Sequence, residues 1–218
     1  MKQSRLVILV ILITLGVSAF GLLIVISGQK AIGAAENHEF PAFEMVYEDW
    51  GQNRGTNSSG GFVRVKLTYL DRFHWRSEIL FDSTVPEISG STSELSPDAF
   101  VHFNAQTNQV TSIPVSPDEP IYAVDDWLIP GKIAAQLDKY HATISPADSA
   151  GIVQMEYTEQ IPCDPEISKC DTSIYQVMTR TKYWVDSQLP TEIIISRDGQ
   201  IRRHVTVTEF KWLNENTQ

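Results

Sequence analysis

Most of the chain beyond residue 40 alternates between apolar and polar positions with a period of two residues. Val65 and Leu67, for example, lie between Arg64, Lys66 and Thr68. This pattern is typical of strands with one face buried and the other in water. It predicts strands over residues 43–48, 63–69, 73–81 and 175–183.

The end of the chain predicts a hairpin. Leu189-Pro190 separates one strand from the next, residues 191–196, and Asp198-Gly199 favours a tight turn into a last strand, residues 201–213. The apolar positions of this last strand change parity after Val207. One inserted residue reconciles the two halves, so we expect a β-bulge at Thr208 or Glu209.

Only one segment after the first apolar run has helical spacing, and it predicts a helix over residues 130–140. Pro130 suits a first helical position. The apolar positions that recur at helical spacing are Ile133, Ala134, Leu137 and Tyr140. Asp125 and Asp126 come shortly before this segment, and we interpret them as carboxylates near the positive end of the helix dipole. Two stretches rich in Ser, Thr and Pro, residues 83–97 and 112–120, predict long loops.

Sequential strands with short connections favour an antiparallel meander. The fold class that we expect is therefore mainly β (α+β), a strongly curved antiparallel sheet or half-barrel with a covering helix. The helix and the loops would cover its apolar concave face.

The chain begins with an apolar run, residues 6–26, that contains no charged side chain. A helix of this length is about 31 Å long and matches the hydrocarbon core of a bilayer. Lys2 and Arg5 precede it, which favours a cytoplasmic N-terminus and a single-pass protein of the cell membrane whose C-terminal domain is extracytoplasmic. A cleaved signal peptide, giving a secreted protein, is the alternative, because Gly33-Ala34-Ala35 offers small residues to a signal peptidase.

These observations divide the chain into five parts, and a single domain follows the tether. The parts are a cytoplasmic tail (1–5), a transmembrane helix (6–26), a tether (27–39), an extracytoplasmic β domain (40–213) and a short tail (214–218).

Charge and cysteine content narrow the partners. The chain has a net charge of −10, and since the first 26 residues hold only two basic charges, the remainder has 15 basic and 27 acidic side chains. This balance argues against nucleic acid as a partner and against adsorption on anionic lipid headgroups.

Cys163 and Cys170 predict a disulfide in an oxidising compartment, since no histidine lies near them to complete a metal site.

No catalytic motif stands out. The Gly-x-Ser-x-Gly elbow, the phosphate-binding glycine loops and the His-Glu-x-x-His helix are all absent from the sequence. We therefore expect no catalytic residues, no metal and no cofactor. An enzyme is the least favoured of three classes of function, because it would need polar residues that converge in a pocket.

Aromatic residues are frequent on the predicted strands. Either they fill an ordinary core, or part of them lines a hollow that a curved sheet with one helix leaves open to an apolar ligand. Assigned by parity, the candidate lining is Phe43, Val65, Leu67, Phe73, Trp75, Val177 and Tyr183.

Three short motifs resemble those of the outer-membrane lipoprotein carriers. Residues 61–65 lead as a glycine-led strand into residues 71–76, Asp-Arg-Phe-His-Trp-Arg, similar to the family's Pro-x-Arg-Phe-Arg-Trp-Glu segment. Residues 103–111 resemble the hairpin that follows. Residues 183–186, Tyr-Trp-Val-Asp, with the later Leu-Pro and Asp-Gly pairs, are similar to the family's ending.

The resemblance implies a half-barrel with a helical lid whose cavity holds acyl chains; relatives include periplasmic lipid-binding lipoproteins and a stress-sensing regulator of an anti-sigma factor. His74 stands where the family favours an arginine that helps to hold the lid closed. The Asp-Gly turn expected near residue 100 is also missing. The carrier shuttles, whereas this chain is expected to stay tethered.

Two functions follow as expectations. The first is a non-catalytic, membrane-anchored domain that binds a lipid or an acylated lipoprotein in an apolar cavity. The second is an envelope signalling or assembly module with the same fold and a filled core, acting through protein partners.

Overall fold

The computed structural model describes residues 40–52, 60–115, 125–129, 131–162 and 174–213, with the side chain of Asp126 excepted. The predicted transmembrane helix (6–26), the tether and both cysteines lie outside these residues, so the anchor and the disulfide stay predictions. Within the described ranges, none of the helices has the length and apolar character needed to cross a bilayer.

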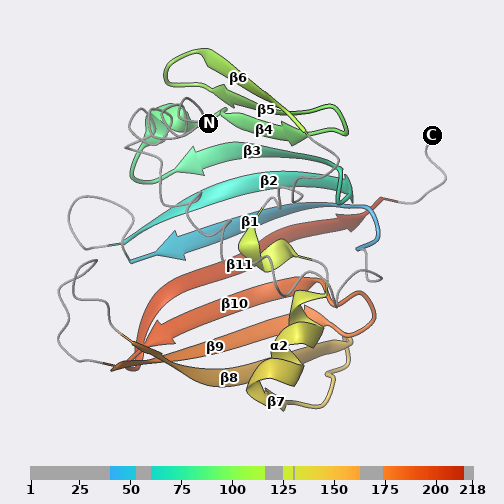
Figure 1. Ribbon diagram of the computed structural model, residues 1–218, viewed down its shortest axis with the longest axis vertical. Helices are drawn as coiled ribbons and strands as arrows, with labels where there is room; N and C mark the ends of the chain where they lie inside the picture. Colours follow the sequence, from blue (N-terminus) through green and yellow to red (C-terminus); the bar gives the residue numbers. More distant parts are fainter. Residues whose placement is uncertain (1–39, 53–59, 116–124, 130, 163–173, 214–218) are drawn as a thin grey trace, which may run out of the picture.

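The described residues form eleven strands, one α-helix and two 3-10 helices, labelled as in Figure 1. The strands of the first half are β1 (Phe43–Gly51), β2 (Gly61–Asp71), β3 (His74–Asp82), β4 (Thr92–Leu95), β5 (Ala99–Asn104) and β6 (Gln109–Pro114). Those of the second half are β7 (Thr143–Ile144), β8 (Ile152–Pro162), β9 (Ile174–Trp184), β10 (Pro190–Arg197) and β11 (Gln200–Trp212). The helical elements are η2 (Pro86–Ile88), η3 (Asp126–Leu128) and α2 (Lys132–Tyr140).

All strands belong to one antiparallel sheet that does not close on itself. Its order is β6-β5-β4-β3-β2-β1-β11-β10-β9-β8-β7, so two meanders meet where the first strand pairs with the last. Figure 1 shows the sheet running from β6 at the top to β7 at the bottom, with η3 in front of β1 and β11 and α2 in front of the lower strands. The predicted class, a mainly β fold with one antiparallel sheet and a helix, is confirmed.

Two local predictions near the C-terminus are also confirmed. Between β1 and β11 the register shifts at Thr208, because Val46 pairs with Glu209 and Tyr47 pairs with Val207. The hydroxyl of Thr208 donates a hydrogen bond to the carbonyl of Val46 at 3.2 Å. The Asp-Gly turn joins β10 to β11, and both of its residues have positive φ, as a tight hairpin requires.

The loop predictions are wrong in part. Residues 83–97 contain η2 and the short strand β4, which pairs with β3 and β5. Strand β6 extends to Pro114, so the second predicted loop begins inside a strand, and most of that loop lies outside the described residues. Strand β8 was not predicted either. The predicted helix is confirmed as α2, which begins at Lys132.

Alternating burial along the strands gives the sheet one apolar face, which we call the inner face. Across β1 and β2 the pairs Phe43–Tyr69 and Met45–Leu67 are buried on this side. Cross-strand partners share a face. The register therefore places the buried members of the other strands on the same side, and these include Trp75, Val153, Met155, Tyr183, Ile193 and Val205. η3 and α2 pack on this face.

Candidate functional site

The inner face holds most of the residues that the sequence predicts as a ligand lining. Five of them are at most 7% exposed, namely Phe43, Val65, Leu67, Trp75 and Tyr183. The strand register places Val177, which is half-buried, on the same face as Tyr183. Six of the seven predicted residues thus share one face, which is the arrangement that binding of an apolar ligand requires; the binding itself stays a prediction.

Phe73 is a correction to the predicted lining. It lies in the turn between β2 and β3, where its side chain is 40% exposed and the guanidinium of Arg72 lies 4.8 Å above the ring. The alternation that placed it beside Trp75 is interrupted by this turn. His74 next to it pairs with Asp71 at 2.7 Å and takes no part in the inner face.

Among the described residues, one segment covers the inner face, and we call its residues, 125–129 and 131–140, the cover. Trp127 and Leu128 are buried in the same core cluster as Phe43 and Leu67. The ring of Trp127 meets that of Tyr47 edge to face, with centroids 5.0 Å apart. The helix of the cover packs over β8 and β9 through Ile133. The part of the inner face at Tyr47 is therefore occupied by the cover's own tryptophan.

A group of charged side chains joins the cover to the sheet. The guanidinium of Arg203 on β11 donates to both carboxylate oxygens of Asp49 on β1, through Nε at 3.1 Å and Nη2 at 2.8 Å. The same Nη2 lies 3.1 Å from Oδ1 of Asp125 in the cover. The hydroxyl of Tyr47 donates to the other oxygen of Asp125 at 3.5 Å. Arg203 therefore links two strands of the sheet to the start of the cover.

This contact corrects the interpretation of Asp125 as a partner of the helix dipole. Its carboxylate receives the guanidinium of Arg203, and α2 begins only at Lys132. The sequence did contain a signal for this contact. Asp49 and Arg203 occupy positions with the parity of buried residues in their strands, and a charge at such a position needs a partner.

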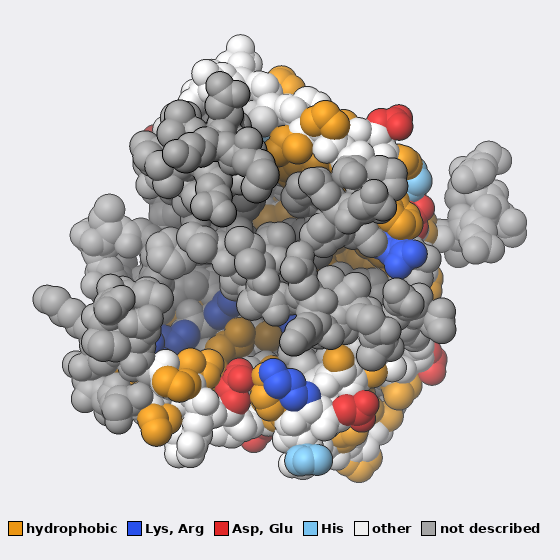
Figure 2. All heavy atoms as spheres, viewed as in Figure 1, with side chains coloured by type: hydrophobic (Ala, Val, Ile, Leu, Met, Phe, Trp, Pro, Cys, Tyr) orange, Lys and Arg blue, Asp and Glu red, His pale blue; other side chains and the backbone are white. Residues whose placement is uncertain are grey.

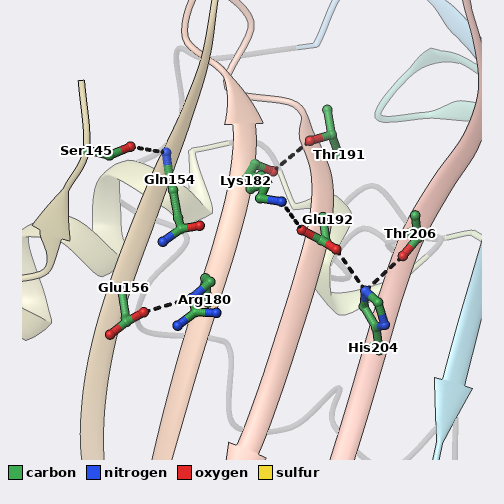
Figure 3. A network of polar contacts seen from close by, with 9 residues as sticks. All are labelled: Ser145, Gln154, Glu156, Arg180, Lys182, Thr191, Glu192, His204 and Thr206. Carbon is green, nitrogen blue, oxygen red and sulfur yellow. Dashed lines mark hydrogen bonds and ion pairs between the residues drawn. The ribbon is translucent and has the colours of Figure 1, made fainter. Parts of the chain in front are cut away.

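The opposite, outer face of the sheet is polar. Figure 3 shows its cross-strand contacts between β8 and β11: Glu156 pairs with Arg180, and Glu192 pairs with both Lys182 and His204. Burial alone would raise the pKa of Glu192, but hydrogen bonds from Lys182 and His204 outweigh it and lower this pKa. Partly exposed ion pairs of this kind stabilise a sheet only slightly. Their charged side chains remain in contact with water, so this face is the solvent-facing side of the sheet.

Two titratable groups on the inner face have shifted pKa values because of burial. Burial raises the pKa of the Tyr183 hydroxyl, which keeps this side chain neutral. Burial lowers the pKa of His102 on β5, whose ring nitrogen lies 3.0 Å from the Ser93 hydroxyl. Both shifts favour the uncharged form, which fits an apolar face.

Figure 2 shows the same side of the molecule in space-filling form. Hydrophobic side chains gather over the lower strands, where Figure 1 places α2 and β8, with acidic and basic side chains between them.

In the part of the chain that the structure describes, no group of three or more His, Cys, Asp or Glu side chains could hold a metal ion.

Solved structures similar to this chain share a low sequence identity with it. An uncharacterised conserved protein from Thermus thermophilus is 11% identical, with a TM-score of 0.45, and the match covers 86% of this chain and 88% of that one. A LolA superfamily protein from Nitrosomonas europaea is 12% identical, with a TM-score of 0.38 and coverage of 87% and 94%. MucB, solved in complex with the periplasmic part of MucA, is 12% identical, with a TM-score of 0.36; the match covers 84% of this chain and 53% of MucB.

No protein-family model matches the chain, and no curated protein matches it either. One of these structures is of a LolA superfamily protein, and the sequence motifs resemble those of the same superfamily.

Proposed function

We propose that this chain is a non-catalytic, extracytoplasmic domain, anchored by residues 6–26, that binds a lipid or an acylated protein on its inner face. One observation supports this proposal above the others. The sheet is open, one of its faces is apolar over most of its width, and among the described residues a short segment, joined to the sheet by polar contacts, covers that face.

The two faces differ in what they can bind. The outer face carries paired charges, and removing these from water is costly. The inner face exposes apolar side chains once the cover moves, and burial of apolar area stabilises a complex by about 25 cal/mol per Å². An acyl chain is a ligand that gains from such a face without needing fixed polar partners.

The proposal predicts that a substitution on the inner face weakens ligand binding and that a matched substitution on the outer face leaves it unchanged. Ile194 and Ile195 are adjacent, half-buried residues of β10 that point to opposite faces. Ile195 packs against the core cluster on the inner face, and Ile194 pairs with His204 on the outer face. Ile195→Thr should weaken binding about fivefold, since it removes roughly 1 kcal/mol of apolar burial, whereas Ile194→Thr should leave binding unchanged.

Binding is measured with the full chain in a nonionic detergent, by titration with dansyl-labelled undecanoic acid and by native mass spectrometry for co-purified lipid. A saturable signal that Ile195→Thr weakens and Ile194→Thr leaves intact supports the proposal. Protein that contains no lipid and ignores the labelled fatty acid contradicts it. The mass of the mature chain decides separately whether residues 6–26 are retained or cleaved.

A second function, docking of an envelope protein, is supported by strand β6. All six residues of this edge strand, Gln109–Pro114, are exposed, and none is charged. An uncharged edge strand offers unpaired backbone groups to another chain, which is the basis of peptide recognition by strand addition. A signalling or assembly module would use this edge and would leave the inner face filled.

Site-specific crosslinking in intact cells separates the two functions. A photoreactive residue at Val110 on β6, 66% exposed, should capture one protein reproducibly if this edge docks a partner. The same residue at Ile201, 48% exposed at the start of β11, is the control. Equal capture at both positions contradicts the docking function.

A further inference from the structure

A small aromatic pocket lies at the rim of the sheet, next to the predicted lipid lining, since the ring of Trp212 meets that of Phe43 edge to face with centroids 6.3 Å apart. It has a volume of about 310 Å³ and is lined by Pro41, Trp184, Asp186, Ser187 and Trp212. Its walls come from the residues just before β1, the end of β9 with the turn that follows it, and the end of β11. None of these residues belongs to the lining that the sequence predicts for an acyl chain.

The two indole rings are arranged to meet one small ligand together. Their centroids lie 6.1 Å apart, and the ring planes are inclined by 54°. A ligand in the angle between the rings can lie within about 6 Å of both centroids, which is the range of a cation–π contact. Phe210 packs against both rings, with its centroid 4.5 Å from that of Trp184 and 4.6 Å from that of Trp212.

The charge of the pocket determines which small ligands it favours. Asp186 is the one charged residue among the five that line it, and its side chain is exposed at the turn. The chain as a whole has a net charge of −10, which favours the approach of cations. Aromatic faces combined with a carboxylate bind organic ammonium groups in preference to neutral or anionic ones.

We propose that Trp184, Trp212 and Asp186 form a binding site for a small organic ammonium ion such as a quaternary ammonium group. The two indoles contact the cation through their faces, and the carboxylate balances its charge from the open side. The same chemical group occurs free in solution and in the headgroups of some lipids, and the pocket recognises the group itself.

Calorimetric titration of the full chain with choline and with 3,3-dimethylbutanol tests the charge requirement. The two probes have the same shape, but only choline is charged. We expect choline to bind in the millimolar range and the neutral isostere to bind at least about tenfold more weakly. Equal binding of the two probes, or no binding of choline, overturns the proposal without any substitution in the protein.

Substitutions then locate the site. Trp212→Leu should weaken choline binding about tenfold, and Trp212→Phe should weaken it less because a ring face remains. Phe81→Leu on β3 is the control, since Phe81 is exposed to a similar extent, 42% against 40% for Trp212. Unchanged affinity in Trp212→Leu places any binding elsewhere and contradicts the proposal.

The carboxylate is tested in the same way. Asp186→Asn should weaken choline binding several-fold at low salt and by less at high salt, because ions screen an exposed charge. Asp138→Asn on the exposed side of α2 is its control and should have no effect. A loss in both variants, or in neither, shows that Asp186 does not contact the ligand.

Titration with glycerophosphocholine separates the two sources of the group. If glycerophosphocholine binds more tightly than choline, the ligand is a lipid headgroup. If it binds more weakly, the ligand is a free cation. This test is independent of the inner face, because Ile195→Thr should leave choline binding intact while it weakens binding of the labelled fatty acid.

Discussion

The contact between Arg203 and the cover predicts how easily the inner face opens. Asp125→Asn keeps an oxygen that can accept a hydrogen bond and removes the negative charge. Hydrogen bonds to charged groups contribute about 1.5–3 kcal/mol and neutral ones about 0.5–1.5 kcal/mol. The side chains of Asp125 and Arg203 are 22% and 25% exposed, so water screens part of this difference. We expect a loss of about 1 kcal/mol, which raises the population of the open cover roughly fivefold.

Hydrogen exchange followed by mass spectrometry measures this opening. In Asp125→Asn, amides of the cover between residues 127 and 140 should exchange about fivefold faster, while those of β1 and β2 keep their rates. Asp138→Asn, at an exposed position of α2, is the matched control. Unchanged exchange in the cover refutes the reasoning, and so does an equal acceleration across the whole sheet, which would mean a global loss of stability.

A double-mutant cycle assigns the effect to the pair. Arg203→Gln removes the cation from both carboxylates, and because Asp49 is 5% exposed, the cost should be about 2–4 kcal/mol. In that background Asp125→Asn should cost less than it does in the native chain, since the contact with Arg203 is already gone. If the effects of the two substitutions are additive, Asp125 is not held by Arg203.

Three other predictions concern stability, measured by urea unfolding of the full chain. Gly60→Ala should cost about 1 kcal/mol more than Gly151→Ala: both glycines have positive φ, but only at Gly60 would the new Cβ lie 2.7 Å from the ring of Trp50. Burial lowers the pKa of His102 below 6.5 in the folded chain, so the unfolded chain binds a proton at this residue more readily than the folded chain does. The free energy of unfolding should therefore fall as the pH drops from about 7 to about 5.5, and His102→Gln should reduce this dependence. Thr208→Ala should cost about 1 kcal/mol, because it removes the hydrogen bond to the carbonyl of Val46, whereas deletion of Thr208 should leave Phe210 and Trp212 on the inner face, because Glu209 would then follow Val207 in a regular ladder with β1.

The sheet could be predicted from the sequence because its information is local. Alternation and turn residues specify strands one at a time, and the Asp-Gly turn and the bulge at Thr208 are each visible within a few residues. Strand β8 carries the same signal, since Val153 and Met155 alternate with Gln154 and Glu156.

The remaining features depend on contacts between distant parts of the chain. Strand β4 has only four residues, and they form a strand because β3 and β5 lie on either side of it. The contact of Arg203 with Asp125 spans 78 residues. Trp127 lies in none of the elements that the sequence predicts, so only the folded chain reveals that its ring packs against Tyr47 on the inner face.

The cover also sets a minimum length for an acyl ligand. If the ligand replaces Trp127 on the inner face, it must first offset the loss of that side chain's burial, which for 150–250 Å² at about 25 cal/mol per Å² amounts to about 4–6 kcal/mol. Each methylene that is buried contributes about 0.8 kcal/mol, so about six of them only compensate for the displaced ring. We therefore expect hexanoate to leave the labelled fatty acid in place, and longer saturated acids to displace it more strongly with each added methylene. In Trp127→Ala the threshold should move to shorter chains. Displacement that is independent of chain length would mean that the ligand does not compete with the cover for the inner face.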